Sequence, residues 1–194
     1  MAGKRAPDYE AKKAEIRDAA ARLLGGQGFD RATLDRVARG LGISIHRVHV
    51  HYSGRERVLA DIVDRHMDLL LTRLEIEAPD SLPGAERLHA LAVAYAGVIA
   101  AATPEHRSVM WHLTHLSDEH RQAVQGRMRW VLALFAQALE DAAPDMAPEW
   151  AKVQALSLLA MLNATAVWFR DGGAVERTQY ARNAARMVLA APRV

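Results

Sequence analysis

Cysteine is absent from this 194-residue sequence, which excludes disulfide bonds and thiolate metal sites. Aromatic residues are few, at 6%, and no stretch shows the apolar and polar alternation that is typical of a half-buried β-strand. Hydrophobic residues nevertheless make up 51% of the chain, which is ordinary for a globular protein. The length suffices to bury a core, and the missing strand patterns indicate that helices form it. We therefore expect an all-α protein.

Long apolar segments are absent as well. The first residues, "MAGKRAPDYEAKK", contain no apolar core and do not resemble a signal peptide. The longest nearly apolar run, residues 155–169, is interrupted by Asn163 and is shorter than the roughly 20 residues of a membrane span. These features predict a cytoplasmic protein that makes no membrane contact.

The charge is distributed unevenly. Residues 1–60 carry 12 Lys and Arg against 7 Asp and Glu, a net +5, whereas the remainder carries 13 against 16, a net −3. A basic N-terminal third favours contact with a polyanion such as nucleic acid. A solvated basic face is the alternative that charge alone leaves open.

Apolar residues recur at helical spacing between clusters of glycine, proline and aspartate. The first expected helix stops at "GGQGF", and Thr33 and Ser44 are suitable N-caps for two short helices. "SGRE", Ser53 to Glu56, has the pattern of a capping box for the next one. The expected helices cover residues 9–24, 33–40, 45–51, 53–74, 84–102, 105–116, 118–142, 148–170 and 175–190.

Two short helices joined by a tight turn at Gly42, with a longer helix on each side, indicate a helix-turn-helix. We expect a three-helix DNA-binding domain over residues 1–55 and a helical ligand-binding and dimerisation domain over 56–194. The second short helix would lie in the major groove of double-stranded DNA. The residues expected on its outer face are Ile45, His46, Arg47, His49 and Val50.

The histidines His46, His49 and His51 also raise the alternative of a metal site. His46 and His49 could share one helix face, but His51 points elsewhere and Glu56 is better used in the capping box. Transition-metal sites need three or four converging donors, and this segment offers two. We therefore expect no metal or cofactor here, and histidines that contact DNA.

Residues 14–59 resemble the N-terminal domain of TetR-family transcriptional regulators. The matching residues are Ile16, Ala20, Gly28, Thr33, Val37, Ala38, Gly42, Ser44, Val48, His51, Tyr52, Arg55, Glu56 and Leu59. The resemblance implies a homodimeric repressor that binds a partly palindromic operator and releases it when a small molecule binds. By position, Thr33, His49, His51 and Arg55 would hold phosphates, while Arg47 and its neighbours from Ser44 to Val50 would read bases. His49 and His46 depart from the usual tyrosine and small residue, which affects the expected operator sequence.

The segment 148–170 is apolar nearly all the way round between Leu156 and Phe169. A helix without a polar face must be covered on every side. A second copy of the protein could supply part of that cover, together with the stripe Tyr180, Ala184, Met187 and Val188 of the last helix. A helix buried entirely within one chain is the alternative.

Bulky residues with a few polar groups are typical of ligand pockets. The candidates in the C-terminal part are Met110, Trp111, His112, His115, Trp130, Asn163, Trp168 and Arg170. Each could instead belong to the core, and a buried Asn163 needs a hydrogen-bonding partner. His112 and His115, with Glu119 and His120 nearby, leave a metal site as a lesser alternative.

Residues 116–135 and 155–173 also resemble the C-terminal domain of TetR regulators that sense acyl-CoA thioesters, through "MLN" and "WFR". This resemblance implies an apolar channel for the acyl chain. The arginines that could meet the nucleotide are Arg121, Arg127, Arg129 and Arg170. A multidrug-type sensor of aromatic or cationic compounds is the alternative. A histidine-assisted hydrolase is disfavoured, because the sequence has no nucleophile elbow, glycine-rich phosphate loop or HExxH motif.

Overall fold

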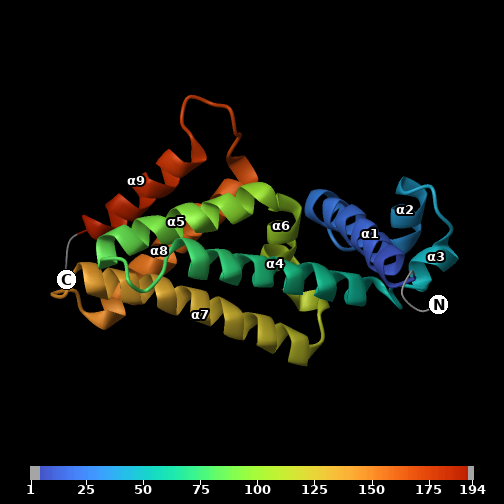
Figure 1. Ribbon diagram of the computed structural model, residues 1–194, viewed down its shortest axis with the longest axis horizontal. Helices are drawn as coiled ribbons and strands as arrows, with labels where there is room; N and C mark the ends of the chain where they lie inside the picture. Colours follow the sequence, from blue (N-terminus) through green and yellow to red (C-terminus); the bar gives the residue numbers. More distant parts are fainter. Residues whose placement is uncertain (1–4, 192–194) are drawn as a thin grey trace. The chain divides into compact units, whose positions relative to one another are not determined.

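The computed structural model describes residues 5–191 of the chain, and every regular element in that range is helical (Figure 1). This confirms the expected all-α class. In chain order the elements are α1 (Arg5–Gln27), α2 (Leu34–Gly40), α3 (Ile45–His49), α4 (Arg55–Glu77), α5 (Gly84–Ala101), α6 (Thr103–Trp111), the 3-10 turn η1 (Leu113–His115), α7 (Asp118–Ala142), α8 (Pro148–Trp168) and α9 (Arg177–Leu189).

The chain divides into two compact units. Among the described residues, one contains 5–66 and 103–124, and the other contains 67–102 and 125–191. Helices α4 and α7 therefore contribute residues to both units. The functional division at residue 55 stays a prediction.

In the first unit, α1 packs against α2 and α6, and α2 packs against α3. Its core-facing residues follow helical spacing, because Ile16, Ala20 and Leu24 are all less than 5% exposed. Leu23, which we expected on this stripe, is only partly buried, and Ala21 takes its place at 0% exposure. The stripe is thus rotated slightly from the predicted one.

Helix α1 stops within "GGQGF" as predicted, but it continues to Gln27, three residues beyond the expected end at Leu24. A Cβ atom at Gly25 would come within 2.8 Å of Pro104 Cα, so this glycine allows α6 to approach α1 closely. Gly28 is the residue that ends the helix. Its φ of +81° is costly for other residues, and its N–H donates to the Leu24 carbonyl at 3.0 Å.

The two short helices begin where their caps predicted. Thr33 Oγ1 accepts a hydrogen bond from the Arg36 backbone N–H, and Ser44 Oγ accepts one from the Arg47 N–H, both at 3.3 Å. Gly42, at φ +64°, makes the turn between them. Helix α3 is shorter than expected, because it ends at His49 instead of His51. The helix-turn-helix arrangement is therefore present.

The side chain of Glu56 is used differently from the capping box that we expected at the start of α4. Its carboxylate accepts a hydrogen bond from the Ser117 backbone N–H at 3.1 Å, just before α7. The helix itself begins at Arg55 and extends to Glu77, three residues beyond the predicted end. The bond from Ser117, 61 residues away in sequence, thus replaces the expected bond of Glu56 within the capping box.

In the second unit, α5 packs against both α8 and α9, which also pack against each other (Figure 1). Leu88, Leu91, Leu158 and Leu162 are fully buried there. Helix α8 is not covered on every side within one chain. Leu156 and Val167 remain 51% and 59% exposed.

Within the described residues, no single helix is long and apolar enough to cross a membrane. Helices α5 and α6 reach that length and apolar content only when they are taken together, and the helical path bends by 101° between them at Ala102.

Candidate DNA-binding surface

Helix α3 presents one buried residue and several exposed ones. Val48 is 0% exposed and anchors the helix to the first unit. Ile45 and Val50 are 38% and 55% exposed, and His46, Arg47 and His49 also reach solvent. The structure therefore places all five residues of the predicted outer face at the surface, where a DNA groove could reach them.

Two predicted DNA-contacting residues have structural roles as well. The hydroxyl of Thr33 caps α2, while the guanidinium of Arg55 donates a hydrogen bond to the Phe29 carbonyl at 3.0 Å. Arg55 also lies over the Phe29 ring, 4.7 Å from its centroid. Removing the Arg55 side chain would consequently loosen the connection between α1 and α2, in addition to any loss of a phosphate contact.

His51 lies just beyond α3 and packs on α1. Its ring centroid is 4.3 Å from that of Tyr9, and its Nδ1 is buried without a hydrogen-bonding partner. Partial burial lowers the pKa of His51, as does the positive charge of Arg47, whereas Glu10 raises it. The lowered pKa favours the neutral form of His51 in the free protein.

Two surface cavities flank this segment. One of about 580 Å³ lies between the start of α1 and α3, and its lining residues are Asp8, Tyr9, Glu10, Lys12, Arg47, Val50 and His51. The other, of about 510 Å³, extends to α4 and α7 and includes Lys13, His49, Arg57, Asp64 and His120. His120 Nε2 lies 3.1 Å from Asp64 Oδ2. In the part of the chain that the structure describes, no three histidine or acidic side chains are arranged to hold a metal ion.

Known protein families share this arrangement of helices. Residues 16–62 match the family "Bacterial regulatory proteins, tetR family", and residues 81–191 match "Tetracyclin repressor-like, C-terminal domain". The chain belongs to the TetR family. It is therefore a DNA-binding transcriptional regulator of the repressor type, and the family is not one of enzymes.

Individual relatives agree with the TetR assignment. The chain is 36% identical over 63 residues to the HTH-type transcriptional regulator SrpR of Pseudomonas putida, a match that spans 32% of this chain and only 30% of SrpR. A TetR-family regulator of Bordetella parapertussis has the same fold, with a TM-score of 0.86, 24% identity and coverage of 92% and 94% of the two chains. AibR, solved in complex with isovaleryl coenzyme A and operator DNA, has a TM-score of 0.76 at 22% identity, with 92% and 96% covered.

In this TetR chain, two of the predicted pocket residues pack against the DNA-binding helices. His112 Nε2 lies 3.2 Å from the Leu24 carbonyl, to which it donates as the Nε2–H tautomer, and is 8% exposed. His115 stacks on Phe29 with ring centroids 3.9 Å apart. Both side chains hold the end of α1, which is a structural role that the sequence did not reveal. Neighbouring Met110 is half-buried and Trp111 is 46% exposed.

The predicted pocket residues of the second unit differ in burial. Asn163 accepts a hydrogen bond from the Tyr95 hydroxyl at 2.7 Å, which supplies the partner that we expected. Trp130 and Trp168 are 41% and 52% exposed, and Arg170 is exposed as well. None of the eight predicted residues lines either of the two surface cavities beside α3, so the ligand-binding role stays a prediction.

A buried histidine pair escaped the sequence analysis. His66 on α4 and His106 on α6 are 2% and 3% exposed, and His66 Nε2 lies 3.0 Å from His106 Nδ1. Burial, with a smaller effect of His106, lowers the pKa of His66 to about 3. The two residues are 40 positions apart, and no local pattern joins them.

Proposed function

We propose that this TetR-family regulator is a homodimeric repressor that binds a palindromic operator through α2 and α3 and is released by an acyl-CoA thioester. The observation that carries the DNA-binding part is the exposed face of α3, held by the buried Val48. Arg47 on that face has a planar donor group, which suits bidentate contacts to guanine. His46 and His49 add donors to the same surface.

Replacing Arg47 by alanine is expected to reduce discrimination between the operator and other DNA. A good bidentate base contact is worth about 1–3 kcal/mol, so the operator should bind about 5–150-fold more weakly. The operator is first selected from random duplexes with the parent protein. Binding is then measured by fluorescence anisotropy at several salt concentrations, since a lost phosphate contact would instead lower the salt slope by about one.

Arg73→Ala is the matched control for Arg47→Ala. Arg73 is an exposed arginine of α4 that pairs with Glu77 at 2.7 Å in the second unit. Its removal should leave operator binding as in the parent. If Arg47→Ala binds the selected operator as tightly as Arg73→Ala does, the assignment of α3 as the base-reading helix is wrong.

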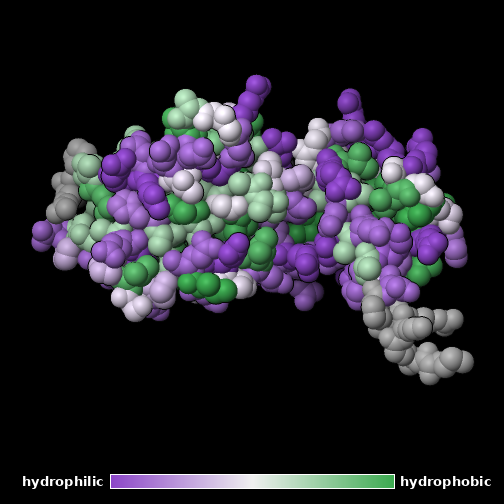
Figure 2. Space-filling view, turned by 45° about the horizontal axis from the view of Figure 1, so that its top comes forward, coloured by the Kyte–Doolittle hydropathy of each residue, from purple (hydrophilic) through white to green (hydrophobic). Residues whose placement is uncertain are grey.

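Dimerisation is supported by an apolar stripe that one chain leaves uncovered. Val153 and Leu156 of α8 are 43% and 51% exposed, Ala160 is exposed and Val167 is 59% exposed. Their spacing places them on one face of the helix. Met187 of the adjacent α9 adds a further exposed apolar side chain at 57%. Hydrophobic side chains likewise reach the surface among hydrophilic ones in Figure 2. A second copy, which would supply the same face, is the partner that we propose for this stripe.

The acyl-CoA part of the proposal rests on two features. The first is the resemblance of residues 116–135 and 155–173 to acyl-CoA-responsive regulators. The second is that AibR, which was solved with isovaleryl coenzyme A, shares this fold. Arg170, exposed immediately after α8, is the residue that we assign to the anionic end of the thioester.

An acyl-CoA is expected to weaken operator binding about 5–150-fold, which is the usual range of allosteric coupling. The free acid should have no effect, because it lacks the nucleotide that Arg170 would meet. Calorimetry with acyl-CoAs of several chain lengths, with and without operator, measures this coupling. Operator DNA must weaken acyl-CoA binding by the same factor, since linkage is reciprocal.

The ligand class is checked in parallel by thermal shift with acyl-CoAs, free acids and cationic dyes, because ligands of the folded state raise the melting temperature. Stabilisation by the dyes alone would favour a multidrug-type sensor. Equal acyl-CoA binding with and without operator would refute release by an acyl-CoA. Loss of acyl-CoA binding in Arg170→Ala would support the role assigned to Arg170.

A further inference from the structure

Helix α3 is too short to keep its own orientation. It contains five residues, Ile45–His49, and isolated helices of this length are unstable because nucleation is costly. The Ser44 cap holds its first turn. Apolar packing of Val48 fixes its depth, but hydrophobic contacts are non-directional. Packing against α2 holds one side of the helix, and directional contacts at its other end complete its orientation.

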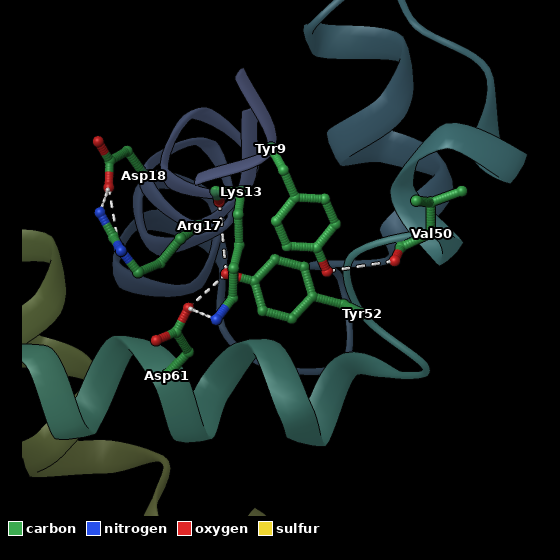
Figure 3. Close-up of polar contacts among 7 residues, drawn as sticks. All are labelled: Tyr9, Lys13, Arg17, Asp18, Val50, Tyr52 and Asp61. Carbon is green, nitrogen blue, oxygen red and sulfur yellow. Dashed lines mark hydrogen bonds and ion pairs between the residues drawn. The ribbon is translucent and has the colours of Figure 1, made fainter. Parts of the chain in front are cut away.

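Such contacts are present where the chain leaves α3. The Tyr9 hydroxyl lies 3.5 Å from the Val50 carbonyl, at the limit of a hydrogen bond, and the Tyr9 ring packs on His51. The next residue, Tyr52, is 3% exposed. Its hydroxyl donates to Asp61 Oδ2 of α4 at 2.5 Å (Figure 3).

Lys13 of α1 completes this cluster. Its Nζ lies 3.6 Å from the same Asp61 oxygen and 5.7 Å from the centre of the Tyr52 ring. In Figure 3, the side chains of Lys13 and Tyr52 converge on Asp61 from two different elements. Burial and the bond to Asp61 raise the pKa of Tyr52. The hydroxyl consequently remains a donor at every pH where the protein would be studied.

We propose that Tyr52, Asp61 and Lys13 are positioning residues that set the orientation of α3 against α1 and α4, and thereby determine how well the protein distinguishes its operator from other DNA. This inference rests on the proposed DNA-binding role of α3. None of the three residues needs to touch DNA. Their link to α3 is the backbone of Tyr52, whose N–H donates to the Val48 carbonyl at 3.0 Å.

The two modes of DNA binding should respond differently to this network. Binding to any sequence depends on the number of cations near phosphates, and that number does not change when a neutral hydroxyl is removed. Base contacts in the groove depend on the placement of donors at hydrogen-bonding distance and angle. A small rotation of α3 therefore weakens operator binding selectively.

Tyr52→Phe tests the proposal because it retains the buried ring and removes only the donor. The operator, selected with the parent protein, should bind about tenfold more weakly, which is the loss expected when one base contact is misplaced. The dissociation constant for unrelated duplex DNA and the salt slope should not change. Both are measured by fluorescence anisotropy on the full-length chain.

The chain offers a matched control and a conservative rescue. Tyr95→Phe removes another buried hydroxyl bond, to Asn163 at 2.7 Å in the second unit, and should cost stability without altering the ratio of operator to unrelated DNA affinity. Asp61→Asn keeps an oxygen that can accept from Tyr52, so it should retain most of the discrimination. Asp61→Ala should lose the discrimination between operator and unrelated DNA. The double variant Asp61→Ala with Tyr52→Phe should discriminate as well as either single variant, because both remove the same bond.

Each outcome decides between the alternatives. An unchanged affinity ratio in Tyr52→Phe, or a parallel loss of affinity for both DNAs, would overturn the positioning role and leave a purely structural one. If Tyr52→Phe does not fold, the comparison of Asp61→Asn with Asp61→Ala answers the same question. Failure of the parent protein itself to select any DNA sequence would instead refute the proposed DNA-binding function.

Discussion

Replacing Leu156 by glutamate is expected to convert the protein to a monomer and to weaken operator binding about 10²–10⁴-fold, because one subunit then loses the effective concentration that its tethered partner supplies. Leu156 is 51% exposed in the single chain, so a carboxylate there remains hydrated and the fold is retained. In the proposed dimer the same carboxylate would be buried in an apolar interface, which is costly. Sedimentation equilibrium measures the association and anisotropy measures the binding.

A control at another exposed apolar site separates the interface from a general effect of charge. Ile76 of α4 is 68% exposed, and Ile76→Glu should remain dimeric with parent-like operator affinity. Val167→Glu, on the same stripe as Leu156, should behave as Leu156→Glu does. A parent protein that sediments as a monomer, or a Leu156→Glu variant that still forms dimers, would contradict the assigned interface. Leu159 is less suitable for this test, because it is only partly exposed.

The features that could be predicted from the sequence are those with local causes. Thr33 and Ser44 each cap the helix that directly follows, so the starts of α2 and α3 were predicted correctly. The sequence "GGQGF" does stop α1, but the end was placed three residues too early, because Gly25 serves the contact with Pro104, 79 positions away, and Gly28 ends the helix. In the same way, the bond of Glu56 to Ser117 prevailed over a local capping box.

In the candidate DNA-binding surface, too, features with local causes could be predicted and features that depend on distant contacts could not. Helical spacing was sufficient to place His46, Arg47 and His49 on the outer face of α3. The residues that orient this helix could not be predicted, because Tyr52 and Asp61 come together only through the packing of α1 and α4. Predicted pocket residues such as His112 and His115 have partners in the first unit, which helical periodicity alone cannot distinguish from ligand contacts.

Acidification is expected to destabilise the protein through the buried His66 and His106 pair. The pKa of His66 is lowered from 6.5 to about 3, chiefly by burial and further by His106. As the pH falls below 6.5, the unfolded chain gains a proton on His66 that the folded protein does not accept. Stability therefore decreases by about 1.4 kcal/mol per pH unit in this window, or about 3 kcal/mol by pH 4. Above pH 6.5 both states are neutral at His66, and the effect disappears.

Urea denaturation of the parent and of His66→Gln between pH 4 and pH 7.5 isolates this effect. Glutamine does not titrate, and its amide can still form a hydrogen bond with His106, which lies 3.0 Å from His66 in the parent. Groups that do not contact His66 titrate alike in both proteins, so their contribution cancels in the difference of the unfolding free energies. As the pH falls to 4, the parent should lose about 3 kcal/mol of unfolding free energy relative to His66→Gln. A pH-independent difference between the parent and His66→Gln would mean that the buried imidazole accepts its proton in the folded protein as readily as in the unfolded chain.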